Sequence, residues 1–163
     1  MTSTGDLDNL DFKIIKEVWN EYDLKGGAKF RARLVLTRLA ENKNAPPPPN
    51  LPPGQSSMAL SMSVQTIVSI FAPETSKGQP TALIPAPNQI KDDKKQEVEI
   101  LTFQEPWNVY EVIKNGTIIR AKLIVNKVYR VIDVYDQFGE PYHLVESGPV
   151  FNVEPPKSKN KFA

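Results

Sequence analysis

Short runs in which hydrophobic and polar residues alternate cover most of this chain. In the clearest run, residues 118–126, one face would hold Ile119, Ala121, Leu123 and Val125, and the other would hold Arg120, Lys122 and Asn126. A period of two is typical of a half-buried strand. Helical spacing occurs only near the start, where Leu7, Leu10 and Ile14 would allow a short amphipathic helix. The pattern therefore predicts an all-β protein.

The alternation changes phase in the middle of this long run. After Lys127 the expected inward residues become Val128, Ile132 and Val134. A phase change inside one strand predicts a β-bulge or a sharp bend.

One stretch of the sequence is repeated. Trp19-Asn20-x-Tyr22 matches Trp107-Asn108-x-Tyr110, and one extra residue near Ile113 restores the register that follows. Over residues 19–39 the two copies share 8 of 21 residues. Because tryptophan is rare, we interpret the match as an internal duplication of one small unit.

Weaker matches lie on both sides of this stretch. Upstream, Phe12 aligns with Ile100 and Glu17 with Glu105. Downstream, Gly78-x-Pro80 aligns with Gly139-x-Pro141.

Each copy reads as about five short, strongly bent strands, which favours a small barrel of the SH3-like, Sm-like or OB type. We therefore expect two tandem homologous units with a proline-rich loop inserted in the first. The expected division is a tail (1–10), a first β unit (11–90) with its insertion (43–57), a charged linker (91–97), a second β unit (98–156) and a basic tail (157–163).

The inserted loop contains a run of prolines that excludes helix and central strand. Such a segment favours extended polyproline II, which suits docking into an aromatic groove or lying along a neighbour, although a simple spacer is also compatible. The expected partner-binding residues are Pro46, Pro47, Pro48, Pro49, Leu51 and Pro52.

The amino-acid composition excludes several kinds of functional site. The chain has no cysteine, one histidine and a formal net charge of +1. Thiolate and multi-histidine metal sites are therefore excluded, and the bulk charge gives no sign of nucleic-acid binding. His143 reads as a strand residue, and Asp133, Asp136 and Glu140 read as solvated turn residues rather than a hard-cation site. We expect no catalytic residue, metal or cofactor.

The basic residues leave an alternative open. Arg31 and Arg33 in the first copy correspond to Arg120 and Lys122 in the second, on the outward parity of their strands. Such rows, with Tyr22, Tyr110 and Tyr129 nearby, could hold phosphates and stacked bases, although outward strand positions are often charged simply to discourage edge pairing. Trp19 and Trp107, at matching positions, are expected to have a structural packing role.

The sequence thus predicts a non-enzymatic structural or interaction protein, such as an accessory subunit or a component of a larger assembly. Protein partners or self-assembly are expected, with nucleic-acid binding through the basic strand faces as the alternative. An enzyme would need a cleft with convergent polar groups, and the expected place for it is between the two units. No apolar run is long enough to span a membrane, and residues 1–12 do not resemble a signal peptide, so a cytoplasmic or virion location is expected.

Overall fold

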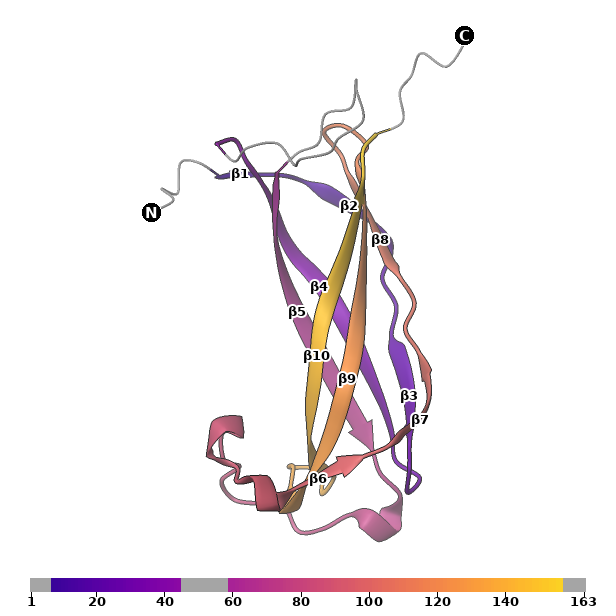
Figure 1. Cartoon of the computed structure of the whole chain (residues 1–163), viewed down its shortest axis with the longest axis vertical. Helices are drawn as coiled ribbons and strands as arrows, with labels where there is room; N and C mark the ends of the chain where they lie inside the picture. Colours follow the sequence, from indigo (N-terminus) through magenta and orange to yellow (C-terminus); the bar gives the residue numbers. More distant parts are fainter. Residues whose placement is uncertain (1–6, 45–58, 157–163) are drawn as a thin grey trace.

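The computed structural model describes residues 7–44 and 59–156, and it shows an elongated all-β molecule (Figure 1). The all-β prediction is confirmed. The strands are β1 (Leu7–Asn9), β2 (Phe12–Lys16), β3 (Asn20–Leu24), β4 (Lys29–Asn42), β5 (Leu60–Phe71), β6 (Lys95–Val98), β7 (Ile100–Gln104), β8 (Asn108–Val112), β9 (Ile118–Tyr135) and β10 (Pro141–Glu154). Three short 3-10 turns follow β5: η2 (Glu74–Ser76), η3 (Pro87–Gln89) and η4 (Asp92–Lys94).

The strands form two sheets of five, and both sheets are assembled in the same way. In the first sheet, β4 pairs with β5 along one edge and with β1 and β3 along its other edge, and β7 pairs with the far edge of β3. In the second sheet, β9 pairs in the same way with β10, β6 and β8, and β2 lies beyond β8. All of these pairings are antiparallel. The long hairpins β4–β5 and β9–β10 run along the length of the molecule (Figure 1).

The two sheets exchange a strand reciprocally. Strand β2 follows β1 closely in sequence, but it crosses to the second sheet, where Phe12 lies opposite Val112. Strand β7 makes the reverse crossing, and Ile100 lies opposite Leu24 in the first sheet. Each sheet is therefore completed by a strand from the other half of the chain.

One hydrophobic core joins both sheets. Its centre is made of alternate residues of β3, β4, β8 and β9, including Leu34 and Leu123, each 2% exposed. Tyr22 stacks on Phe30 with ring centroids 4.2 Å apart. The apolar face predicted for residues 119–125 is confirmed, because all four of its side chains are buried. Burial against the opposite sheet explains the period of two, since only one face of each strand meets the core.

The predicted bulge is present, and β4 has one at the matching position. Asn126 is the extra residue of β9, because Val125 lies opposite Ser147 and Lys127 opposite Glu146. Thr37 is the extra residue of β4. Its hydroxyl donates to the Ser63 carbonyl oxygen at 3.0 Å.

The inward set expected after the bulge is partly wrong. Val128 is buried, but Ile132 is 41% exposed and Val131 is buried in its place. A second irregularity lies between the pairs Tyr135–Pro141 and Arg130–His143, and Asp133 there has a φ of 62°. The alternation is lost between Val128 and Val131, just before this distortion, so a strand pattern extended past Val128 selects the wrong face.

Three other expectations differ from the observed strands. The helix suggested by Leu7, Leu10 and Ile14 is wrong, because strands β1 and β2 lie there. The downstream alignment is also wrong: Gly78 follows β5, whereas Gly139 precedes β10, and the Gly78 N–H donates to the Gly139 carbonyl oxygen at 2.9 Å. Within residues 7–44 and 59–156, no strand pairing closes either sheet into a barrel.

Candidate interaction surfaces

The repeated tryptophan motif supplies buried polar groups that join the two sheets. Asn20, on β3, donates through Nδ2 to the Tyr22 hydroxyl and to the Leu123 carbonyl oxygen of β9, both at 2.9 Å. The Tyr22 hydroxyl then donates to Glu105 Oε2 at 2.8 Å, and the same carboxylate oxygen accepts the Val125 N–H at 2.8 Å. A chain of hydrogen bonds thus runs from the first sheet into the second.

The second copy forms the corresponding chain in the opposite direction. Asn108 donates to the Leu34 carbonyl oxygen of β4 at 2.9 Å and lies 3.4 Å from the Tyr110 hydroxyl. The Tyr110 hydroxyl donates to Glu17 Oε2 at 2.7 Å. The other oxygen of Glu17 accepts from Arg33 at 3.1 Å.

Both tyrosines are held in the neutral form. Burial raises the pKa of Tyr22 and of Tyr110 well above the ordinary value of a phenol, and the carboxylates of Glu105 and Glu17 raise it further. A buried polar group without a partner would cost about 1–3 kcal/mol, so these networks need all their members. Sequence reasoning singled out the tryptophans, aligned the two glutamates and placed Tyr22 and Tyr110 beside the basic rows, but it gave Asn20 and Asn108 no role.

The tryptophans themselves are half-buried and lie beneath cations. The Arg31 guanidinium lies 4.5 Å from the centroid of Trp19 and 5.5 Å from that of Phe71. The Lys122 ammonium lies 5.5 Å from the centroid of Trp107. These cation–π contacts fit the structural role expected for the tryptophans, although they leave each ring partly accessible.

The four basic residues proposed for nucleic-acid binding lie on two different sheets, on β4 and on β9. Arg31 and Lys122 are stacked on rings, as described above. Arg33 forms an ion pair with Glu17, and Arg120 forms one with Glu154. The structure therefore does not bring the four cations together into one stripe.

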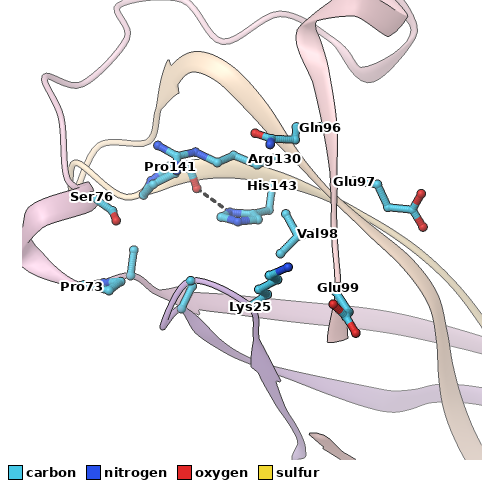
Figure 2. Close-up of a pocket in the computed structure, with 13 residues that line it drawn as sticks. Lys25, Pro73, Ser76, Gln96, Glu97, Val98, Glu99, Arg130, Pro141 and His143 are labelled. Atoms are coloured by element: carbon cyan, nitrogen blue, oxygen red, sulfur yellow. Dashed lines mark hydrogen bonds between the residues drawn. The ribbon is translucent and has the colours of Figure 1, made fainter. Parts of the chain in front are cut away.

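A polar pocket of about 410 Å³ lies where the β3–β4 turn, β6 and the start of β10 meet (Figure 2). Arg130 and His143 enter it from the second hairpin, and Lys25 enters from the opposite side. His143 Nδ1 lies 2.8 Å from the Pro141 carbonyl oxygen, to which it donates. Burial lowers the pKa of His143, with a smaller contribution from Arg130, so the imidazole is neutral at pH 7.

Residues of both halves of the chain line this pocket, which is the location expected for an enzyme's cleft. His143 makes its hydrogen bond to a main-chain oxygen, a contact that orients the imidazole ring. Ser76 lines the pocket, and the structure describes no hydrogen bond between its hydroxyl and His143. The pocket can hold water or a small polar molecule.

The acidic residues of the β9–β10 turn have structural partners. Asp136 Oδ1 accepts the N–H groups of Phe138 at 2.8 Å and Glu140 at 3.0 Å. Glu140 is buried; its Oε2 accepts the Ala72 N–H at 2.8 Å, and its Oε1 lies 3.6 Å from the Lys77 ammonium. Among the described residues, no three acidic or histidine side chains converge to hold a metal ion.

The outer edge of β5 differs from the corresponding edge of the second sheet. Strand β5 pairs with β4 alone in the part of the chain that the structure describes. Its sequence, LSMSVQTIVSIF, has no charged residue, no proline and no glycine over 12 residues. An exposed edge of this kind is a template for pairing with another strand.

Strand β10 occupies the matching place and is protected. Its 14 residues include Glu146, Gly148, Pro149 and Glu154, and its pairing with β9 is interrupted twice. Charges, proline and irregularities are the usual devices that keep an edge strand from pairing. The asymmetry singles out β5 as the candidate interaction surface.

The expected partner-binding residues Pro46, Pro47, Pro48, Pro49, Leu51 and Pro52 lie outside the described residues. No helix in the described ranges is long and apolar enough to cross a membrane. No protein-family model matches the chain, and no curated protein or solved structure is detectably similar to it.

Proposed function

We propose that this chain is a non-enzymatic structural or interaction protein, a component of a larger assembly that binds a protein partner along the free edge of β5. The observation that carries the proposal is the 12-residue edge without charge, proline or glycine. Asn20 and Asn108, two of the most buried polar side chains, support it too, because they link the two sheets to each other instead of facing a ligand. The proline-rich segment with Pro46–Pro49 is the second expected contact.

We also propose that the two halves arose by duplication of one unit that once paired with itself. Under the sequence alignment, the registers agree: Asn20 lies opposite Ala32, and Asn108 lies opposite Ala121. Thr37 and Asn126 also coincide as bulge residues. A homodimer that exchanged strand β2 would give this arrangement after gene fusion, because strand exchange is a low-cost route to dimers.

Photo-crosslinking in an extract of the native source tests the partner-binding role. A photoreactive residue replaces Ile67, which is 47% exposed on β5, or Val150, which is 42% exposed on β10. The two positions match, since Ile67 lies opposite Arg33 and Val150 opposite Lys122. We expect discrete adducts from position 67 and not from 150. Equal labelling from both would reject the β5 edge as the binding surface.

Nucleic-acid binding remains the second candidate, and one observation favours it. Arg31 lies between Trp19 and Phe71, which is 50% exposed, and together they form a cation–aromatic platform outside β4. Bases of single-stranded nucleic acid stack on such platforms. Arg31→Ala should then weaken binding of a labelled oligonucleotide, and affinity should fall steeply with salt. No measurable binding at low salt would dismiss this candidate.

A further inference from the structure

We infer that the occupant of the β5 edge is β5 of a second copy of this chain, paired antiparallel about a twofold axis. This inference rests on the proposed function, because it names the partner of the same surface. Twofold pairing is the commonest way in which a protein associates with itself, and it places a surface against itself.

The charge pattern of β5 suits pairing with itself. In an antiparallel pair about a twofold axis, a charged residue near the axis faces its own copy, and like charges directly opposite are destabilising. Strand β5 has no charged residue in any position from Leu60 to Phe71, so no register brings like charges of this strand together. Strand β10 carries Glu146 and Glu154, so a register with its axis at either residue would place like charges opposite each other.

One register also matches the shapes of the side chains. With the axis at Ile67, this residue faces its own copy on the outer face. On the inner face, Val68 then lies opposite Thr66 and Ile70 opposite Val64. Cross-strand pairs of β-branched residues are among those that stabilise sheets.

The basic residues of the neighbouring strand do not oppose this pairing strongly. Arg31 and Arg33 lie on β4, so β5 and its copy would separate the two basic rows. Three strand spacings of about 4.8 Å give roughly 14 Å between β4 and its copy. That distance exceeds the Debye length of about 8 Å at physiological ionic strength, so the repulsion is screened.

Space is available at the end of the edge. A groove of about 680 Å³ lies beside Val68–Phe71, and its far wall includes Phe138, Pro141 and Tyr142. Phe138 is 73% exposed. An incoming strand would bury this ring and the exposed side of Phe71, which adds apolar area to the hydrogen bonds of the new ladder.

The first experiment measures the molar mass of the full chain by light scattering and analytical ultracentrifugation over a concentration series. We expect a monomer–dimer equilibrium. Ile67→Lys should raise the dimer dissociation constant by about tenfold or more, because two lysines would meet at the axis. Val150→Lys is the matched control on β10 and should leave the constant unchanged. If Ile67→Lys fails to fold, the cysteine variants described next test the same axis.

The second experiment uses the absence of cysteine from the chain. Ile67→Cys should form a disulfide-linked dimer on mild oxidation, because residues directly opposite in an antiparallel pair come within disulfide range. Val150→Cys should remain monomeric under the same conditions. Linkage in both variants, or in neither, contradicts the proposed axis.

The outcomes separate this inference from the function on which it rests. In one outcome, the chain stays monomeric at every concentration while position 67 still crosslinks to another protein. That result rejects a second copy as the occupant of the β5 edge and retains the partner-binding role. A monomer without any crosslinks from position 67 overturns both.

Discussion

At the scale of single residues, the repeated motif works through its asparagine and tyrosine, which are almost fully buried. Each tyrosine hydroxyl accepts or lies near an amide of its own strand and donates to a carboxylate contributed by the other half of the chain. These carboxylates belong to Glu17 and Glu105, which lie two residues before Trp19 and Trp107 in the sequence. A single substitution in this network should therefore weaken the contact between the two sheets.

Removing one hydroxyl tests this directly. Tyr22→Phe and Tyr110→Phe should each lower the free energy of unfolding by about 1–3 kcal/mol, because a partly buried carboxylate loses its donor. Urea denaturation measures the change. Tyr142→Phe is the control, since the structure describes no hydrogen bond through that hydroxyl, and it should change stability by less than about 0.5 kcal/mol. Equal stability of all three variants would show that the networks contribute nothing.

The same tyrosines predict an alkaline limit. Their pKa values are raised in the folded chain, so their contribution to stability is complete below the unfolded value of about 10 and is lost as pH rises above it. The slope is up to about 1.4 kcal/mol per pH unit for each tyrosine. Urea midpoints between pH 8 and 11 should show a shallower slope in both Tyr→Phe variants. An unchanged slope would contradict the assignment.

At the scale of elements, the connection after β5 packs against the end of the β9–β10 hairpin. Thr81 exchanges two hydrogen bonds with Tyr135: its N–H donates to the Tyr135 carbonyl oxygen at 3.0 Å, and its Oγ1 accepts the Tyr135 N–H at 2.9 Å. Gly78 lies against the Tyr135 ring so closely that a Cβ there would be 2.5 Å from Cζ. This contact ties the first hairpin to the second.

Gly78→Ala should therefore be costly. Overpacking typically costs about 1–3 kcal/mol, and here the tyrosine ring must shift while Thr81 holds its main chain. Gly148→Ala is the matched control, because a Cβ at Gly148 would meet nothing within 4 Å and its φ is ordinary. We expect that variant to be neutral or about 0.4–1 kcal/mol more stable. Similar urea midpoints for the two variants would show that the contact is loose.

At the scale of the whole molecule, the exchanged strands make the two halves dependent on each other. Without β7 the first half would leave one edge of β3 unpaired, and without β2 the second half would leave one edge of β8 unpaired. The hydrophobic core also contains residues of both halves. We therefore expect one cooperative unfolding transition for the full chain.

Splitting the chain between residues 90 and 91 tests this interdependence. Neither fragment should show a cooperative transition alone, and an equimolar mixture should recover the native fold. Each fragment carries one tryptophan, Trp19 or Trp107, so fluorescence can follow both. Circular dichroism provides the folding control. A fragment that unfolds cooperatively by itself would show that the halves are independent domains.

The local sequence determined much of this structure. Alternation located the long strands, because each strand buries one face, and the change of phase located the bulge at Asn126. Glycine at positions 27 and 116 allows the turns that follow β3 and β8, since both residues have positive φ values, of 94° and 79°. The repeated motif marked the residues at which the two copies are matched.

Only the tertiary structure decided which strands pair. A strand such as β2 has the same pattern of hydrophobic positions whichever sheet it joins, so nothing local distinguishes pairing with β3 from pairing with β8. For the same reason the sequence aligned Glu17 with Glu105 without showing that each carboxylate reaches a tyrosine of the other copy. Those contacts join residues more than 80 positions apart, and their energy exists only once both sheets are formed.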